Sequence, residues 1–342
     1  MTKNLLLLAA LALFASCRKS SVADSETPAP DTIKKMNIAV TGPDSFVAAP
    51  VRQGTANFNF LGYGYNITGK YADSSSVRAQ VINISAYAAA NPDRVDVGRS
   101  TSGGFNTLFA KNAEDYSSKI STNLEATNGM KLFKNTITTA FPNQDAISDK
   151  YVYAQYEYGI TWKTIKTYLY DAEVKNYLTP EFSNDVQNLT PENLVKKYGT
   201  HVLAQITLGE KFDVYFQAKS SDNDKLHSSI VGFTYTLKQA FGLMSGYLDL
   251  LKPADVNAIS EPRLVYEVIG GDPSKVTKTV TDKGTFVRFN DWVATCTEDK
   301  ALFKDILPQG LTPLYDLIAD PAKKAEVKSY ITSYMEQNQV KI

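Results

Sequence analysis

The sequence predicts an α+β domain built around a large, mostly antiparallel β-sheet. Residues 202–218 alternate an apolar face with a mostly polar one, and residues 151–163 alternate in the same way, as side chains do along a strand. At about 3.3 Å per residue, the first run would extend roughly 55 Å, far beyond an ordinary strand of about 5–6 residues. Strands this long usually belong to a large bent sheet, and segments with helical spacing precede and follow them.

The bulk composition excludes several classes of function. Lys and Arg number 36 against 36 Asp and Glu in 342 residues, so no basic excess indicates nucleic-acid binding. The sequence has only two His and two Cys, and it contains no metal-ligand cluster, phosphate-binding loop or dinucleotide fingerprint. We therefore predict no enzymatic activity, no cofactor and no metal.

Residues 1–17 have the pattern of a bacterial lipoprotein signal peptide. Lys3 supplies a positive charge, residues 5–14 are apolar but too short to span a bilayer, and two small residues precede Cys17. The pattern predicts an acylated Cys17, with a plain secretory signal and a chance cysteine as the alternative. Residues 18–32 are rich in Ser, Ala, Pro and acidic side chains, which is typical of a flexible tether. Residues 33–342 are predicted to form a single domain.

The first part of that domain is the least regular. Glycine-punctuated aromatics in residues 33–69 indicate its start, and residues 76–86 are predicted as a strand. Residues 103–142 show little strand pattern and suggest short helices and loops. After the long strand over 151–163, residues 164–178 have mostly helical spacing.

A short helix leads into the longest alternating run. Thr190 suits the N-cap and Pro191 the first helical position, where its missing N–H would have no partner. Gly199 suits the C-cap, where a left-handed conformation is common. Within the strand that follows, Glu210 interrupts the apolar face. It would either pair with a lysine or face solvent at the end of the sheet.

The rest of the chain mixes both kinds of element. Residues 230–251 fit strand alternation and helical spacing equally well. Strands are predicted over 263–269, ended by Gly270-Gly271, and over 286–294, whereas residues 301–307 have helical spacing. A last helix begins after Asp320 and carries one apolar stripe. Cys296 is predicted to be a small buried residue.

The block Tyr198-Gly199-Thr200-His201, at the end of a predicted helix, resembles the signature of the membrane-attack-complex/perforin (MACPF) family. Val202 stands where that signature usually has an aromatic residue. A long strand, the pair Gly270-Gly271, Trp292 and the segment 313–318 follow in the family's order, so the resemblance covers roughly residues 50–338. It implies a bent and twisted four-stranded antiparallel sheet flanked by two helical clusters, with C-terminal helices.

The resemblance also implies how such a fold would act on a membrane. In pore-forming members, subunits assemble into a ring or arc, and each helical cluster unwinds into an amphipathic β-hairpin. By order along the chain, the clusters would lie within residues 103–143 and 219–260. In the second, a charge-free set of alternating residues could face lipid, namely Val231, Phe233, Tyr235 and Leu237. The same residues could equally be the core face of a stable helix. The first cluster is a poorer candidate because charged side chains recur along it.

Individual motif residues have structural as well as functional interpretations. His201 lacks any visible catalytic partners in the sequence, so we predict that the block Tyr198–His201 is structural. Gly270-Gly271 would either let the sheet flex at its bend or form only a turn.

The sequence leaves two functions open. The first is an oligomerising, pore-forming protein with an antibacterial toxin as its expected role, lipid-anchored to the bacterial outer membrane and either surface-exposed or released. The second is a non-lytic adhesion or glycan-binding module. The expected partners are membrane lipid or surface glycan and lipopolysaccharide.

Overall fold

Four long strands form the centre of the molecule. The computed structural model describes residues 32–43, 54–169 and 172–342. The long strands are β4 (Val95–Ala110), β5 (Tyr151–Thr167), β7 (Gln205–Ser220) and β8 (Ile259–Ile269). They pair antiparallel in the order β8-β7-β5-β4, which confirms the predicted four-stranded antiparallel sheet. Strand β1 (Ala39–Thr41) adds in parallel to β8, and β11 (Leu302–Ile306) pairs with the first half of β7.

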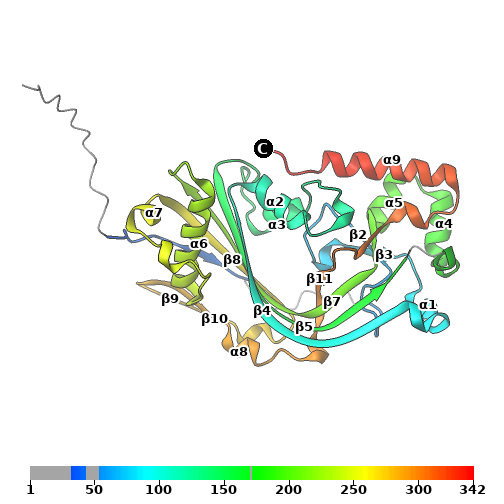
Figure 1. The fold of residues 1–342 in the computed structure, drawn as a ribbon, viewed down its shortest axis with the longest axis horizontal. Helices are drawn as coiled ribbons and strands as arrows, with labels where there is room; N and C mark the ends of the chain where they lie inside the picture. Colours follow the sequence, from blue (N-terminus) through cyan, green and yellow to red (C-terminus); the bar gives the residue numbers. More distant parts are fainter. Residues whose placement is uncertain (1–31, 44–53, 170–171) are drawn as a thin grey trace, which may run out of the picture.

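The sheet bends where three of its ladders are irregular. The register shifts between Arg99 and Ser102 on β4, between Thr161 and Lys163 on β5, and next to Lys304 on β11. All three shifts lie at the level of residues 207–209 of β7, and bulges of this kind increase local bending and twist. Figure 1 shows the long strands descending from the upper left and turning to the right along this line.

Two helical clusters connect neighbouring strands. The first cluster, residues 111–150 between β4 and β5, contains α2 (Ala113–Ser121), the 3₁₀ turn η3 (Glu125–Thr127) and α3 (Lys134–Ala140). The second cluster, residues 221–258 between β7 and β8, contains α6 (Lys225–Phe241), η5 (Leu248–Leu250) and α7 (Pro253–Asn257). In Figure 1, α2 and α3 lie on the inner side of the bend and α6 on the outer side.

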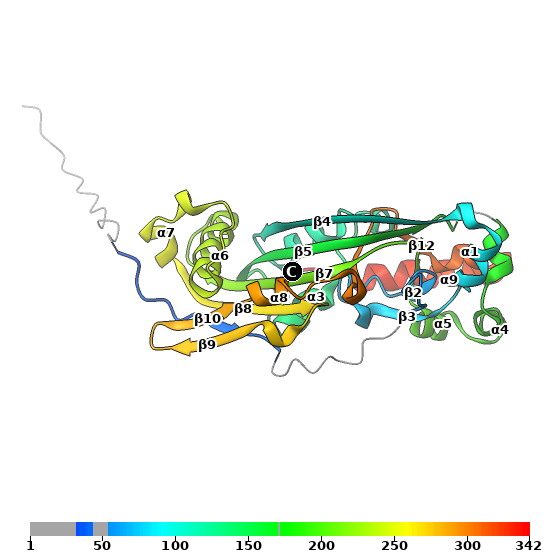
Figure 2. The ribbon, with the colours of Figure 1, turned by 90° about the horizontal axis from the view of Figure 1, so that it is seen from below.

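A small second sheet and several helices close the other end of the molecule. The sheet has the order β12-β6-β2-β3, formed by Leu311–Pro313, His201–Leu203, Tyr63–Tyr65 and Val77–Gln80. Figure 2 shows it beside α1 (Ile84–Ala90), α4 (Pro180–Asn188), α5 (Pro191–Tyr198) and α9 (Pro321–Gln337). A hairpin of β9 (Thr277–Thr281) and β10 (Gly284–Arg288) lies at the opposite end, and α8 (Asn290–Val293) follows it nearer the middle of the molecule. Short 3₁₀ turns fill the remaining connections: Ser74–Ser76, Pro92–Arg94, Ala172–Tyr177, Pro273–Lys275, Glu298–Lys300 and Leu314–Leu317.

The long strands separate two hydrophobic cores. Alternate residues of β7, including Phe212, Val214 and Phe216, pack in the outer core with Phe233 and Leu237 of α6. On the opposite face, residues of β5 and β7 contribute to the inner core together with residues of α2 and α3, among them Tyr151, Tyr153 and Tyr215. Both faces of β7 are therefore buried up to Ala218, including the face that the sequence marks as mostly polar.

The helix caps were predicted correctly, but several segments have a secondary structure other than the predicted one because of how the strands pair. The N-caps Thr190 of α5 and Asp320 of α9 are confirmed, and the ambiguous residues 230–241 are helical. Residues 103–110 belong to β4 and residues 164–167 to β5, where helices or loops were predicted. The predicted helix over 301–307 is wrong, because β11 there pairs with β7. The predicted strands over 76–86 and 286–294 each end early and give way to α1 and α8. The run 202–218 is interrupted at Ala204, whose N–H donates to the Gly310 carbonyl.

Candidate functional site

The block Tyr198–His201 forms the junction between α5 and the small second sheet. The α5 helix ends at Gly199, whose φ of 78° is disfavoured for other residues. A methyl group at Gly199 would also lie 2.5 Å from the carbonyl group of Tyr65, so the position requires glycine for two reasons. Thr200 Oγ1 accepts from the Ile67 N–H at 3.1 Å and contacts the Tyr65 carbonyl oxygen at 3.3 Å. These bonds tie the end of α5 to β2 and to the chain that follows it.

The side chain of His201 is almost completely buried in this junction. Its Nδ1 lies 2.9 Å from Thr200 Oγ1, and only 2% of the residue is exposed. Burial lowers the pKa of His201 to about 3, so the ring is neutral at physiological pH. Tyr198, three residues earlier, donates its hydroxyl to Asp185 of α4 at 2.7 Å. The geometry is that of a packed joint between two helices and a sheet.

The candidate lipid-facing residues of the second cluster lie on α6. Val231, Phe233 and Leu237 are fully buried, whereas Tyr235 is half-buried. On a helix, residues two apart do not share a face but residues four apart do, so Val231 and Tyr235 lie on one side of α6 and Phe233 and Leu237 on another. Their polar neighbours Thr234 and Thr236 are buried as well and make hydrogen bonds, the first to Ser245 Oγ at 2.5 Å and the second to the Gly232 carbonyl at 2.8 Å.

A glycine, Gly232, allows α6 to lie close against the sheet. A methyl group at Gly232 would lie 3.0 Å from the ring of Phe216 on β7 and 3.3 Å from Ile259 on β8. The Ser229 hydroxyl donates to the Tyr153 carbonyl at 2.6 Å and accepts from the Ala110 N–H at 3.3 Å. The helix is thus held by apolar packing and by hydrogen bonds to β4 and β5.

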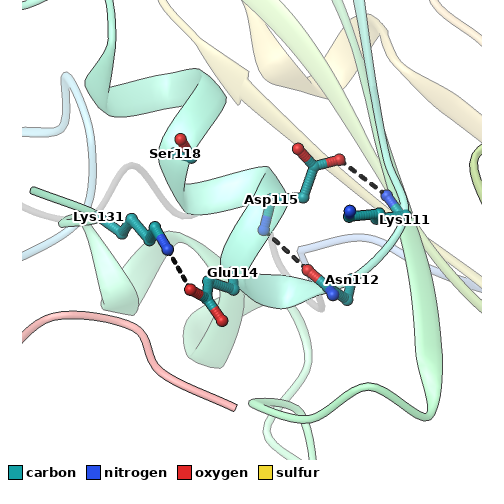
Figure 3. Close-up of a pocket in the computed structure, with 6 residues that line it drawn as sticks. All are labelled: Lys111, Asn112, Glu114, Asp115, Ser118 and Lys131. Carbon is teal, nitrogen blue, oxygen red and sulfur yellow. Dashed lines mark hydrogen bonds and ion pairs between the residues drawn. The ribbon is translucent and has the colours of Figure 1, made fainter. Parts of the chain in front are cut away.

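The first cluster contains a polar cavity of about 290 Å³ at the start of α2. Figure 3 shows Lys131 reaching Glu114, and the Asp115 carboxylate accepting from the backbone N–H of Lys111 at 3.0 Å. Asn112 caps the helix by accepting from the Asp115 N–H at 2.8 Å. The cavity is completed by Ser118. Its charged side chains of both signs are largely paired within the cluster.

Gly270 and Gly271 end β8 in a crowded place. Both have positive φ, 75° and 62°. Methyl groups there would lie 2.5 Å from Glu210 Cγ and 2.6 Å from Trp292 Nε1, and that indole donates to the Gly270 carbonyl at 3.0 Å.

The expectation that Glu210 pairs with a lysine or faces solvent is wrong. Glu210 is fully buried and accepts from the indole N–H of Trp162 at 2.6 Å.

Sequence reasoning missed a buried ionic network on the inner face of the sheet. Lys211 and Asp213 of β7 lie 3.3 Å apart and are only 4% and 1% exposed. Asp213 also accepts from Gln155 Nε2 at 3.0 Å, and Gln155 accepts from the Tyr116 hydroxyl of α2 at 2.8 Å. The polar alternation in the sequence marks this face, but nothing in it shows that helices bury the charges.

Other predicted features can be placed only in part. Cys17 and the signal and tether up to residue 31 lie outside the described residues. Cys296 is buried, and burial raises the pKa of its thiol to about 12. Within the described part of the chain, no group of three or more His, Cys, Asp or Glu could hold a metal ion. None of the described helices is long and apolar enough to cross a membrane.

A family model described as the MAC/Perforin domain matches residues 48–341. The chain belongs to the MACPF family. Two solved structures share the fold: a putative cell invasion protein with a MAC/Perforin domain from Bacteroides thetaiotaomicron, and GNIP1Aa from Chromobacterium piscinae. The first has a TM-score of 0.64 and 15% identity over 83% of this chain, and the second 0.60 and 17% over 82%. No curated protein matches the sequence.

This MACPF chain is shorter than the proteins whose fold it shares. The match covers 61% of the Bacteroides protein and 56% of GNIP1Aa. At these identities the comparison establishes the fold, a bent sheet with two helical clusters of the kind found in perforin-like proteins.

Proposed function

We propose that this MACPF protein forms pores by inserting β-hairpins from its two helical clusters into a target membrane. One topological observation carries the proposal. Each cluster connects two strands that are already antiparallel neighbours, β4 with β5 and β7 with β8. Either cluster can therefore be drawn out as an extension of an existing strand pair, with no change of strand order. A barrel closed by many such pairs would leave no unpaired strand edge in lipid.

Both clusters are long enough for this change. Each contains about 40 residues, or roughly 20 for each strand of a hairpin, whereas a tilted transmembrane strand needs about 9–11. The excess would span the distance between the sheet and the membrane surface. Length alone does not distinguish the two clusters, but their side-chain patterns do.

The register of β7 and β8 supports a membrane hairpin in the second cluster. Ser220 pairs with Ile259, so continuing the ladder for fourteen residues would place Thr234 opposite Ser245. In that register, Val231, Phe233, Tyr235 and Leu237 share a face with alternate residues of the returning strand. Those residues are Gly242, Met244, Gly246, Leu248 and Leu250. This face carries no charge over about nine residues of each strand, which matches the width of a bilayer core. Lys238 and Asp249 fall on the opposite face.

The wider setting of the proposal comes from the sequence. Acylation of Cys17 would anchor the protein to the bacterial outer membrane, either exposed at the surface or released. The subunits would assemble into a ring or arc on lipid, surface glycan or lipopolysaccharide of a target cell. An antibacterial toxin fits this combination of a bacterial export signal and a pore-forming fold.

Engineered disulfides test the proposal because the structure offers a locking pair and a matched permissive pair. The hydroxyl oxygens of Ser220 and Ser228 lie 2.7 Å apart, and a disulfide from Ser220→Cys with Ser228→Cys would fix the start of α6 to the end of β7. In a hairpin these residues would be about 26 Å apart along one strand. The hydroxyls of Thr234 and Ser245 lie 2.5 Å apart, and these residues would also face each other in the hairpin. Thr234→Cys with Ser245→Cys should therefore be tolerated in both states.

The readout is dye release from vesicles that contain bacterial lipids and lipopolysaccharide. The first disulfide should abolish release and a reductant should restore it, whereas the second should leave release intact. Absence of release and of rings from the wild-type protein under every lipid composition would contradict pore formation. Equal inhibition by both disulfides would contradict the proposed register.

The alternative function is a non-lytic adhesion or glycan-binding module. The charged and internally paired first cluster favours it, because unfolding that cluster into lipid would expose charges that now have partners. In that case, binding to cells or glycans should be the same for the wild type and for both disulfide variants, with or without reductant. Binding that changes with the first disulfide would contradict this alternative.

A further inference from the structure

The bend of the sheet is crossed by one lysine side chain. Lys304 is the residue that the register of β11 on β7 skips, so it stands out from the ladder at the bend. Its stem lies over two glycines, Gly159 of β5 and Gly209 of β7. Methyl groups at these positions would lie 2.5 Å from Lys304 Cε and 3.1 Å from Lys304 Cδ, respectively. The lysine stem therefore occupies the space that a side chain at Gly159 would need, and it also borders the position of a side chain at Gly209, where the Ile160 carbonyl oxygen lies closer still.

The charged end of the same side chain has a partner on the far strand. Lys304 Nζ lies 3.2 Å from Glu157 Oε1 of β5, and the two side chains are 11% and 26% exposed. Since β11 and β5 lie on opposite sides of β7, this ion pair spans three strands. Breaking a largely buried pair by removing one partner leaves an uncompensated charge, which is strongly destabilising.

A second side chain crosses the bend on the other face. Trp162 is skipped in the ladder between β5 and β7, and its indole N–H donates to Glu210 of β7. Gly270 at the end of β8 packs against Glu210 Cγ. Successive side chains along β7 point to opposite faces of the sheet. Lys304, over Gly209, and Trp162, over Glu210, therefore lie on opposite faces of the sheet at the same point along β7.

We propose that Lys304 and Trp162 form a two-sided clamp that holds the sheet in its bent conformation, and that this clamp has to open before the sheet can straighten. The first part concerns the monomer in solution. The second part rests on the proposed pore-forming function, because straightening would accompany insertion of the hairpins. The bend is thus held by side chains from the bulges themselves, and the helical clusters are not its only restraint.

Hydrogen exchange of the full chain in solution tests the clamp without reference to pores. Lys304→Ala removes the stem and the charge, and should speed exchange of the backbone amides in residues 158–163 and 207–211 at least tenfold. Lys304→Met keeps most of the stem and should have a smaller effect. Glu157→Gln added to Lys304→Met should bring exchange part of the way back toward the wild-type rate, because it removes the carboxylate that has lost Lys304 but also takes a negative charge from the surroundings of Lys211. Trp162→Phe should speed exchange in the same segments from the other face.

Two further variants serve as controls, one for failure of Lys304→Ala to fold and one for loss of an ion pair away from the bend. Gly159→Ala leaves Lys304 in place but displaces its stem, so it should reproduce the faster exchange even if Lys304→Ala fails to fold. Lys150→Met removes an exposed pair with Asp145 at the start of β5 and should change nothing at the bend. Wild-type exchange at the bend in Lys304→Met, Gly159→Ala and Trp162→Phe would overturn the clamp. Faster exchange without any dye release would leave the clamp standing and count against the proposed function.

Discussion

The two helical clusters cover opposite faces of the same sheet, and what they cover differs. On the outer face, α6 packs apolar side chains such as Phe233 and Leu237 against Phe216 and its neighbours. On the inner face, α2 closes over a network in which Tyr116, Gln155 and Asp213 are linked by hydrogen bonds next to Lys211. The second cluster is held mainly by the hydrophobic effect, whereas the first also shields paired charges from water.

This difference bears on how each cluster could leave the sheet. Apolar side chains released from α6 would lose their protein contacts but could be buried again in a bilayer, which is equally apolar. Releasing the first cluster would return Lys211, Asp213 and Glu157 to water, where charged groups are well solvated. The second cluster is thus suited to lipid, while uncovering the inner face is compatible with an aqueous space.

The largest effect is expected from breaking the inner network. Burial by itself lowers the pKa of Lys211. The nearby carboxylates of Asp213 and Glu157 outweigh this effect and raise the pKa above its ordinary value, so the lysine is charged. Lys211→Met would leave Asp213 buried without its partner and should lower the free energy of unfolding by about 3–5 kcal/mol. Chemical denaturation measures this loss. Lys219→Met is the control on the same strand, because its pair with Glu261 is exposed and should contribute less than about 1 kcal/mol. Equal losses in both variants would show that the inner network is no stronger than a surface pair.

A somewhat smaller effect is expected from a charge on the proposed lipid face of the second cluster. Met244 is 60% exposed in the folded protein, so Met244→Arg should change its stability little. In the hairpin the arginine would lie within the bilayer at a cost of about 2–4 kcal/mol, which should slow dye release roughly 30- to 1000-fold. Leu226→Arg is the control, since Leu226 is 40% exposed and falls on the opposite face in the same register. Unchanged release by Met244→Arg would remove the distinction drawn between the clusters.

The smallest effect is expected from acid and should not distinguish the clusters. Because burial holds the pKa of His201 at about 3, the unfolded chain binds a proton below about pH 6.5 while the folded protein does not. Stability should therefore fall as the pH falls, by about 2 kcal/mol from this group between pH 6.5 and 5. Urea unfolding at several pH values measures the slope, and His201→Gln should reduce it. Since His201 lies in the small second sheet, amides of both clusters should respond alike, and selective loosening of one cluster would point to a different titrating group.

Local sequence signals predicted those parts of the fold that short-range physics controls. Thr190, Pro191 and Gly199 define α5 because caps depend on backbone groups within one turn. The long strands β5, β7 and β8 and the MACPF signature were visible because alternation and the Tyr198–His201 block are local patterns, whereas β4 was not predicted. The order of the predicted strands located the second cluster, whereas the first was expected from residue 103 and begins only after β4, which was not predicted as a strand.

The remaining features depend on partners far along the chain. Residues 302–306 became a strand because β7 offers an unpaired edge there, and the choice of helix for residues 225–241 reflects burial against the sheet. The inner ionic network and the crossing of the bend by Lys304 could not be predicted, since alternation shows that Lys211 and Asp213 share a face but not what covers it. Sequence by itself therefore determined the family, three of the four long strands and the caps of α5 and α9. Tertiary structure alone decided which charges are buried and what holds the bend, because burial and pairing energies arise only when distant segments meet.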